Sequence, residues 1–585
     1  MRKDDMDVLN PIYTEKAACQ DCYKCVRQCT VKAIRVENGR AAVVKDLCIL
    51  CGHCVEVCPV GAKKVRSDLD RAKRLINSGK RVIASLAPSF ASEFPGIGLE
   101  RMTAALTRLG FWAVSETAWG ADLVAREVAT QLQTAAPDAI LVSSACPTVV
   151  DYITKYRPAF AGRITSLVSP LMAQARELHQ LYGNDCAVVF IGPCISKKQE
   201  ADEHGQDVAV AIDFEDLRSW LAEEKLMLPL VQADPETRII PERAGKGALY
   251  PVDGGMIAAI KSWNVPAYVK FMSFSGIEEI ERALDDLEEA QGLGGMEGPL
   301  FLELLACPGG CINGPRSKTR TGTIRKRLSV LEYGQHRPLG QMAMSLEDSE
   351  GLLVHSWTAS PVGVDVIGEQ ALSEALRRTG KFSRDDELNC GGCGYDTCRD
   401  FARAMLVGRA EPEMCVSYMR KLAQKKANGL IRAIPSGVVI VDNGLSIVEC
   451  NYNFARILGD EALQLWEAKP GLEGASLIKL LPFHRYFQDV LDGADAIDRD
   501  IRFNSRILHT TIFGIERGAF AGGVFQDVTA PWVQKDRVVS QARKVITRNL
   551  AVVQKIAFLL GENAAETEAT LNSIIESFEK SEGNP

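Results

Sequence analysis

The pattern of apolar and polar residues changes along the chain and divides it into regions of different type. Between about residue 80 and residue 315, short continuous apolar runs alternate with segments whose apolar residues recur every three or four positions. Short apolar runs predict buried strands, and the three-to-four spacing predicts amphipathic helices. Regular alternation of the two predicts an α/β domain with a largely parallel sheet.

Three of the predicted strands end at a cysteine. They cover residues 138–146, 187–194 and 299–307 and end at Cys146, Cys194 and Cys307. Helices are predicted between them over residues 214–224 and 277–291, the second with Ile277, Ile280, Leu284 and Leu287 near one face. Because parallel sheets bind ligands where their strands end, the three thiols are expected to converge.

A fourth cysteine, Cys311, follows Cys307 by four residues through Pro308, Gly309 and Gly310. The glycines permit a tight turn that brings both thiols to one metal. Four converging cysteines suffice for one buried 4Fe–4S cluster. The alternative for any single buried cysteine is a small apolar packing residue.

The first sixty residues hold eight cysteines in two runs with C-x2-C-x2-C-x3-C spacing. This is the spacing of a two-cluster bacterial-type ferredoxin, in which the fourth cysteine of each run ligates the other cluster. One 4Fe–4S cluster is therefore predicted on Cys19, Cys22, Cys25 and Cys58, and a second on Cys48, Cys51, Cys54 and Cys29. A pair of zinc sites is the alternative, although zinc sites usually join two C-x2-C pairs over a longer stretch.

A further set of cysteines has the pattern C-x2-C-x4-C and is followed by Cys415 after an apolar helix predicted at 401–407. Its first three members are Cys390, Cys393 and Cys398. The set resembles a small 4Fe–4S module found in several redox proteins, and zinc remains the alternative. Cys186 and Cys450 fall outside every set and are interpreted as packing residues.

Beyond Gly429 the pattern becomes that of a small α/β domain. Strands at 437–441 and 446–450 flank Asp442-Asn-Gly444, a strong hairpin signal, and a helix is predicted at 452–458. Later strands are predicted at 500–503, 507–515 and 522–525. The segment resembles a PAS sensor domain over roughly residues 428–530. His484 and His509 could ligate haem or a metal, but a lone histidine is more often a surface or packing residue.

The chain ends with apolar residues at three-, four- and seven-residue steps, which predict a helix. They are Val539, Ala542, Ile546, Val553, Ile556 and Leu560. This stripe either packs on its own PAS domain or pairs with a second chain, and charged flanks favour a signalling coiled coil.

Composition narrows the range of partners. The 585 residues are 46% hydrophobic and carry a formal net charge of −7, without a sustained basic stripe, which argues against nucleic acid. No signal peptide and no apolar run long enough to span a membrane are visible. Eighteen cysteines without an export signal favour metal ligation in the reducing cytoplasm over disulfides.

Three segments around the strand-end cysteines resemble the signature motifs of iron-only (di-iron) hydrogenases. They read Ser-Ser-Ala-Cys-Pro at 143–147, Gly-Pro-Cys-Ile-Ser-Lys-Lys-Gln-Glu at 192–200 and Glu-Leu-Leu-Ala-Cys-Pro-Gly-Gly-Cys at 303–311. The family patterns are T-S-C-C-P, M-P-C-x-x-K-x-x-E and E-x-M-A-C-x-x-G-C. With the ferredoxin-like front end, the resemblance covers about residues 10–315.

The resemblance implies an H-cluster, in which Cys146, Cys194, Cys307 and Cys311 hold a cubane and Cys311 bridges to a di-iron unit. In the family this unit carries carbon monoxide, cyanide and a dithiolate, installed by dedicated maturation proteins. Lys197 matches the lysine that pairs with one cyanide, and its alternative is a surface lysine. Pro88 and Ser89 match the loop that contacts the other cyanide.

Several positions depart from the family pattern. Ala145 stands where the family has its proton-relay cysteine, and loss of a positioned proton-transfer group costs roughly 10²- to 10⁴-fold in rate. Gly192 and Leu305 replace methionines near the di-iron unit, and Gly192 is expected to open space beside it. Leu171 replaces the glutamine of a serine-proline-glutamine element. The pattern is similar to that of the sensory subgroup of these hydrogenases.

The sequence therefore predicts a multidomain α/β and α+β protein. Its predicted parts are a two-cluster ferredoxin-like domain (1–70), an H-cluster domain (78–375), a 4Fe–4S module (380–425), a PAS domain (428–530) and a C-terminal signalling or dimerisation helix (531–585). The expected function is a low-activity hydrogenase that senses hydrogen and signals through PAS to a partner of the kinase or phosphatase class. The alternatives are a working ferredoxin-linked hydrogenase and a scaffold that never receives the di-iron unit.

Overall fold

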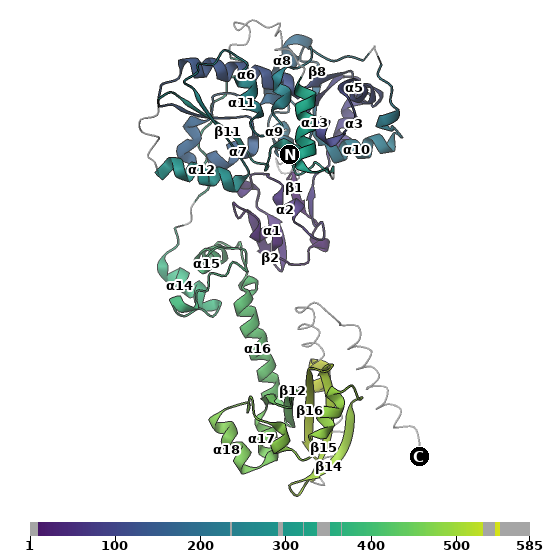
Figure 1. The fold of residues 1–585 in the computed structure, drawn as a ribbon, viewed down its shortest axis with the longest axis vertical. Coiled ribbons are helices and arrows are strands. Elements are labelled where there is room, and N and C mark those ends of the chain that lie inside the picture. The colour runs from purple at the N-terminus through teal and green to yellow at the C-terminus, as the bar shows by residue number, and fades with distance from the viewer. Residues whose placement is uncertain are drawn as a thin grey trace, which may run out of the picture. The chain divides into compact units, whose positions relative to one another are not determined.

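A computed structural model describes residues 10–234, 237–289, 297–319, 321–335, 351–363, 366–529 and 544–549. The chain forms two compact units, Met1–Cys415 and Val416–Pro585. Figure 1 shows the elements of each unit, and each unit is described by itself.

The ferredoxin-like part of the first unit is built from two small antiparallel ladders. β1 (Ile12–Thr14) pairs with β4 (Lys63–Val65), and β2 (Ile34–Glu37) pairs with β3 (Arg40–Val43). One short helix lies within each cysteine run, α1 (Lys24–Arg27) in the first and α2 (His53–Glu56) in the second. The two runs therefore occupy equivalent positions in the two halves of this part.

The α/β region contains two separate parallel sheets, whereas the sequence pattern suggested one. The first has the order β6 (Ala113–Glu116), β5 (Arg81–Leu86), β8 (Cys186–Gly192), β9 (Val210–Asp213). The second has the order β10 (Lys270–Ser275), β11 (Leu300–Leu305), β7 (Ile140–Val142). Apolar periodicity identifies strands but does not specify their hydrogen-bonding neighbours, so the division into two sheets was not visible in the sequence.

Helices cover both sheets (Figure 1). They are α3 (Leu69–Ile76), α4 (Phe90–Glu93), α5 (Leu99–Arg108), α6 (Thr117–Thr134), α7 (Pro147–Tyr156), α8 (Pro170–Tyr182), α9 (Ser196–Glu203), α10 (Phe214–Glu223), α11 (Gly255–Ile260), α12 (Ile277–Glu289) and α13 (Thr323–Gln335). The helices predicted at 214–224 and 277–291 are confirmed as α10 and α12. All four apolar residues of the predicted α12 stripe are buried, as expected for its core-facing side.

The cysteine-containing module near residue 400 also belongs to the first unit. α14 (Glu369–Arg378) packs on α15 (Cys398–Leu406), and Leu372, Leu376 and Phe401 are buried between them. The module is bonded to the ferredoxin-like part, because the Val36 amide donates to the Arg409 carbonyl at 3.0 Å. The Glu411 carboxylate also accepts the amides of Asn38 and Gly39.

The second unit has a five-stranded antiparallel sheet of order β13-β12-β16-β15-β14. Its strands are β12 (Gly437–Asp442), β13 (Ile447–Cys450), β14 (Ile497–Phe503), β15 (Arg506–Glu516) and β16 (Phe520–Asp527). Its helices are α16 (Val416–Ala433), α17 (Tyr452–Leu458), α18 (Asp460–Ala468), α19 (Leu477–Leu480) and α20 (Arg485–Leu491). Most of the predicted C-terminal stripe lies outside the described residues, although 544–549 are helical.

The predicted hairpin joins β12 to β13, but its turn differs from the two-residue type that Asn-Gly favours. The Asp442 carboxylate accepts the amides of Gly444 and Ser446, both at 2.9 Å, and Leu445 adopts the left-handed conformation with φ 56°. The aspartate side chain therefore organises a longer loop.

Asn451 connects three segments of this second unit. Its Oδ1 accepts the amides of Val438 and Phe454, and the second of these bonds caps α17. Its Nδ2 donates to the carbonyls of Ile431 at 3.0 Å and Ser436 at 2.8 Å. The Asn451 side chain is fully buried, so water cannot replace its hydrogen bonds to these backbone amides and carbonyls.

Substituting Asn451→Ala should destabilise the second unit by about 2–4 kcal/mol, because it removes a helix cap and leaves buried backbone groups unpaired. Amide hydrogen exchange of β12 and α17 in the full chain should become about 30-fold faster or more. Asn453→Ala is the matched control, since Asn453 donates a single bond to the Ile434 carbonyl. Equal exchange in the two variants would contradict the role assigned to Asn451.

Candidate metal centres

The structure brings the four strand-end cysteines together at the meeting point of the two sheets. Cys146 follows β7 and caps α7, Cys194 follows β8, and Cys307 and Cys311 follow β11. Burial raises the pKa of the Cys307 thiol well above its ordinary value, and the nearby thiols of Cys311, Cys194 and Cys146 raise it further. The same causes raise the pKa of Cys311. These thiols are therefore costly to ionise unless a cation binds them.

The turn between Cys307 and Cys311 is as tight as its glycines suggested. Gly309 and Gly310 have φ values of 76° and 98°, a region that L side chains rarely adopt. A Cβ at Gly310 would also collide with the Pro251 carbonyl oxygen. Glycine is therefore required here for Cys311 to reach the other three thiols.

Two polar groups predicted to belong to this site, Ser89 and Lys197, have capacity for an additional ligand, and the charge of Lys197 acts on Cys146 and Cys311. The Ser89 hydroxyl is buried and has no hydrogen-bond partner among the described residues. The Lys197 ammonium donates to Ser169 Oγ at 2.8 Å and to Glu200 Oε2 at 2.6 Å, which leaves one of its three protons. Both groups fit an anionic, hydrogen-bond-accepting group such as cyanide. Pro88, before Ser89, is also buried.

The side chain of Ala145 is a methyl group, so only its backbone takes part in the local hydrogen bonds. Its amide donates to Ser143 Oγ at 3.1 Å, and that hydroxyl in turn donates to the Met256 sulfur at 3.0 Å. A thioether accepts weakly and cannot pass a proton on. The chain of hydrogen bonds that starts at the Ala145 amide therefore ends at the Met256 sulfur.

Gly192 does not open space, contrary to the expectation from its sequence. A Cβ at this position would collide with the ring of Phe190 and would lie 2.9 Å from Ala87 Cβ. The phenylalanine two residues earlier occupies the volume that a larger residue at 192 would need. Leu305 and Leu171, which replace polar or sulfur-containing family residues, are both buried.

The ferredoxin-like cysteines lie near one another across the two runs. The charges that raise the pKa of Cys25, after burial, include those of Cys22, Cys19 and Cys58. For Cys51 burial and the nearby thiols of Cys29 and Cys48 raise the pKa to about 12. Cys29 thus lies beside the second run and Cys58 beside the first.

Backbone amides support three of these sulfurs. The amides of Ala33, Leu50 and Ala62 donate to the sulfurs of Cys29, Cys48 and Cys58 at 3.2, 3.3 and 3.2 Å. Although burial raises the pKa of Cys58, bonds from amides such as Lys63 and Ala62 outweigh it and lower the pKa below its ordinary value. Such donors stabilise a thiolate, which is the form that ligates iron.

One helix connects the two groups of thiols. α7 begins after Cys146, and its end holds the loop before the second ferredoxin run, because Tyr156 Oη donates to the Leu47 carbonyl at 2.6 Å. Lys155 Nζ donates to the Cys48 carbonyl at 3.0 Å. Cys51 is also among the thiols whose charge acts on Cys307. No sequence pattern predicted the roles of Lys155 and Tyr156, because these contacts span more than 100 residues.

In the later module, Cys393 lies near Cys415 and Cys390, whose thiols act together with burial to raise its pKa. Cys398 begins α15, and its amide donates to Asn389 Oδ1 at 2.8 Å beside Cys390. Within the described part of the chain, no three Cys, His, Asp or Glu side chains are close enough to hold a single metal ion.

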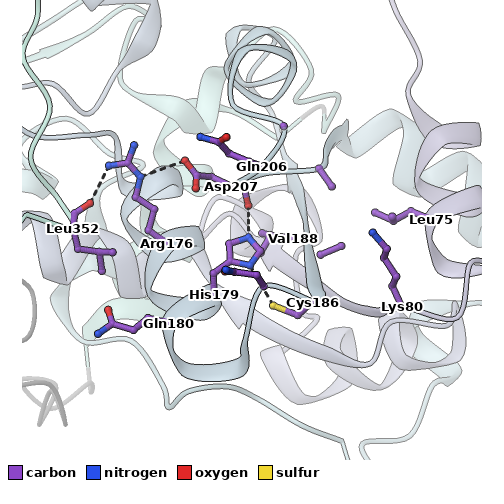
Figure 2. Close-up of a pocket in the computed structure, with 14 residues that line it drawn as sticks. Leu75, Lys80, Arg176, His179, Gln180, Cys186, Val188, Gln206, Asp207 and Leu352 are labelled. Atoms are coloured by element: carbon purple, nitrogen blue, oxygen red, sulfur yellow. Dashed lines mark hydrogen bonds and ion pairs between the residues drawn. The ribbon is translucent and has the colours of Figure 1, made fainter.

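The remaining candidates have protein partners. His484 Nδ1 bonds the Leu481 carbonyl, and His509 lies between Asp498 and Asp500. Cys450 is buried in the core of the second unit. Cys186 is buried too, and its sulfur lies 3.5 Å from His179 Nδ1 at the wall of a surface pocket of about 850 Å³ (Figure 2). None of the predicted metal ligands lines this pocket.

Comparison with known proteins accounts for these groups of cysteines. Residues 80–315 match the family described as "Iron only hydrogenase large subunit, C-terminal domain". Residues 11–59 match a 4Fe–4S dicluster domain, 386–417 a putative Fe–S cluster and 426–496 a PAS domain. The chain carries a domain of the iron-only hydrogenase family.

Relatives with this domain include Iron hydrogenase 1 of Clostridium pasteurianum, which is 26% identical over 48% of this chain. The chain spans 59% of the length of that relative. The NADP-reducing hydrogenase subunit HndD of Solidesulfovibrio fructosivorans is 25% identical over 56% of this chain and 68% of its own length. The periplasmic [Fe] hydrogenase large subunit of Nitratidesulfovibrio vulgaris is 24% identical over 55% of this chain and 90% of its own length.

Among solved structures, an [FeFe]-hydrogenase HydA1 from Chlamydomonas reinhardtii is 18% identical, with a TM-score of 0.41 over 51% of this chain and 100% of its own length. The PAS domain of an HTR-like protein from Haloarcula marismortui is 16% identical, with a TM-score of 0.15 over 19% of this chain and 97% of its own length. None of the described helices of the hydrogenase-like chain is both long and apolar enough to cross a membrane.

If Cys29 ligates the cluster of the second run, Cys29→Ser should change the same electron paramagnetic resonance signal as Cys51→Ser. It should leave the signal that Cys22→Ser removes, because the thiols of Cys29 and Cys51 lie together. Cys186→Ser, outside every set, is the control and should leave all signals intact. A Cys29→Ser spectrum that matches that of Cys22→Ser would contradict the crossed ligation.

Proposed function

We propose that this chain is a hydrogen sensor with low hydrogenase activity, whose output passes through the PAS domain to a partner. The observation that carries the proposal is the coexistence of four gathered thiols with Ala145, which offers no proton carrier. A site that keeps its metal ligands but lacks the first proton-transfer group is suited to binding hydrogen rather than to fast turnover.

Cys146, Cys194, Cys307 and Cys311 would hold the H-cluster in this proposal, with Cys311 bridging to the di-iron unit. When bound, this group supplies the reversible conversion of hydrogen into two protons and two electrons. Lys197 and the Ser89 hydroxyl would orient the unit by donating hydrogen bonds to its anionic ligands. The buried Leu305 and Leu171 would exclude water from it.

Proton exit would be slow because the residues beside the site do not carry protons. The Ala145 methyl cannot accept a proton, and the Ser143 hydroxyl is engaged with the Met256 sulfur. The Glu303 carboxyl lies close enough to Cys311 for its charge to act on that thiol, and burial raises the pKa of Glu303 to about 7. However, this carboxyl accepts the amides of Gly254 and Ile257, which hold it in a structural role.

Electrons would leave through the ferredoxin-like clusters, starting with the one on Cys29, Cys48, Cys51 and Cys54. The nearness of Cys51 to Cys307 and the contacts of α7 with the Leu47–Cys48 loop support this first step. The module of Cys390, Cys393, Cys398 and Cys415 would receive them next, since it is bonded to the ferredoxin-like part through Arg409 and Glu411. A third 4Fe–4S cluster is proposed there.

The output would use the helix and PAS domain that follow the module. α16 begins at Val416, directly after Cys415, and Val416 is also the first residue of the second unit. A change in the redox state of the cluster on Cys415 would therefore act at the residue that precedes this unit. A kinase or phosphatase is the proposed class of partner, and the C-terminal residues are proposed to dimerise. Hydrogen, a ferredoxin-type carrier and maturation proteins complete the set of partners, in a reducing cytoplasm.

A catalytic, ferredoxin-linked hydrogenase is the second candidate, and the similarity to relatives named as hydrogenases favours it. The two functions differ in turnover. A scaffold without the di-iron unit is the third, and it differs in lacking the metal-bound cyanide and carbonyl bands of the infrared spectrum.

Restoring the relay with Ala145→Cys should raise hydrogen turnover with a reduced viologen by about 10²-fold or more, because a thiol would take up the proton at the first step. Ala145→Ser is the matched control of similar size, and its hydroxyl is too weakly acidic to serve, so little change is expected. Equal cyanide and carbonyl bands in all three proteins would establish equal loading. Two outcomes would contradict the proposal that Ala145 limits proton transfer. One is wild-type turnover that matches efficient hydrogenases, and the other is no gain in turnover in Ala145→Cys.

Hydrogen should also change amide exchange in the second unit of the matured full chain, relative to nitrogen. Cys393→Ser should abolish the change while leaving the infrared bands, because it interrupts the path after the H-cluster. Cys450→Ser, a substitution within the PAS core, tests whether disturbing that core alone mimics the loss. A hydrogen response that persists in Cys393→Ser would remove the module from the signalling path.

A further inference from the structure

Lys381 is a buried ammonium beside one cysteine of the module. The residue is 4% exposed, and its Nζ lies 3.2 Å from the Cys415 sulfur. Its other acceptors are the carbonyl and the hydroxyl of Thr379, both at 3.3 Å. Three protons thus meet three acceptors, and the sulfur is the one acceptor among them that can become an anion.

The backbone at Lys381 is fixed by the end of α14. The Lys381 amide donates to the Leu376 carbonyl at 3.1 Å, and the Gly380 amide donates to the Arg377 carbonyl at 2.9 Å. Gly380 has a φ of 70°, and this pair of bonds is the Schellman motif. These two bonds therefore fix the backbone from which the Lys381 side chain extends to the Cys415 sulfur. A helix cap presents the lysine to the module interior.

Burial of this charge requires compensation. No carboxylate of the described residues lies within ion-pair distance of Lys381 Nζ, although the module has ion pairs elsewhere, as between Arg399 and Glu369. An isolated buried ammonium is strongly unfavourable, whereas an anionic partner offsets the cost. A 4Fe–4S cluster ligated by four thiolates is such an anion, and reduction adds one more negative charge to it.

A second buried polar group faces the same cysteines. The Tyr395 hydroxyl has no hydrogen-bond partner among the described residues. The residue itself is 5% exposed and lies close enough to Cys393 for the charge of that thiol to act on it. A protonated, unpartnered donor near Cys393 also fits an acceptor at the centre of the module.

The ferredoxin-like part offers a comparison. Lys63 is also buried, and its charge acts on Cys25 and Cys54. Its Nζ donates to Thr14 Oγ1 at 2.6 Å and to the Ala41 carbonyl at 2.9 Å, and no bond to sulfur is formed. Direct donation to a cluster-ligating sulfur distinguishes Lys381, and hydrogen bonds to sulfur together with net charge set cluster potentials.

We propose that Lys381 is a positioning residue that raises the reduction potential of the cluster on Cys390, Cys393, Cys398 and Cys415. The raised potential makes this cluster the acceptor at which electrons from the other clusters accumulate. The inference rests on the proposed function, because it assumes a cluster in the module. It adds the residue that directs electrons to the cysteine preceding α16.

The test is potentiometry of the full, cluster-loaded chain followed by electron paramagnetic resonance. Cys390→Ser identifies the module signal by removing it. In Lys381→Met the reduction equilibrium of that signal should become about tenfold less favourable, a fall of about 59 mV for one electron. The signals of the two ferredoxin-like clusters should not move. Lys381→Arg should restore most of the lost potential, because it keeps the charge.

Two further variants separate charge from packing and from surface effects. Lys381→Gln keeps a donor to sulfur without the charge. A fall in potential similar to that of Lys381→Met would therefore assign the effect to charge. The glutamine variant also serves as the test if the methionine variant does not fold. Arg378→Met removes an exposed charge of the same helix and should leave the potential unchanged. An unchanged potential in both Lys381→Met and Lys381→Gln would overturn the inference. Absence of any signal that depends on Cys390 would instead overturn the third cluster of the proposed function, and with it this inference.

Discussion

A thiol held away from water stays protonated or binds a metal, and four half-buried thiols within electrostatic range of one another disfavour ionisation. Cys146, Cys194, Cys307 and Cys311 form such a group, and both burial and mutual repulsion raise the pKa of Cys307 and Cys311. A cationic iron–sulfur core would remove this cost by taking the place of the protons. The two parallel sheets, the strand lengths and the Gly309-Gly310 turn all serve to place these four sulfurs.

Helix α7 links the α/β region to the ferredoxin-like part. α7 is capped at Cys146 and ends at Tyr156, whose hydroxyl holds the loop before Cys48. Ten residues of helix span about 15 Å, and a helix does not stretch. The separation of the two groups of thiols is therefore set by a rigid element. On the other side, Arg409 and Glu411 bond the module to the β2–β3 hairpin, so three cysteine sets share one compact unit.

Polar and apolar groups are unevenly distributed around the proposed site. Lys197 and Ser89 have donor capacity suited to an anionic ligand, whereas Ala145, Leu305 and Leu171 are apolar. The ring of Phe190 fills the space beside Gly192. Binding a group and turning it over place different demands on a site, and these substitutions spare the first demand. In the module, Lys381 places a buried positive charge beside the Cys415 sulfur.

Local patterns in the sequence were sufficient for the features that depend on short stretches of chain. Cysteine spacing predicted thiols that lie near one another, the strand ends predicted where Cys146, Cys194 and Cys307 stand, and apolar periodicity predicted α10 and α12. The tertiary structure decided what depends on distant segments, such as the division into two sheets and the contact of Lys381 with Cys415, 34 residues away. The spacing of residues in a short segment limits the distances between their side chains, so it can be used for prediction. Contacts between distant segments depend on the path of the whole backbone and on the side chains that it brings together.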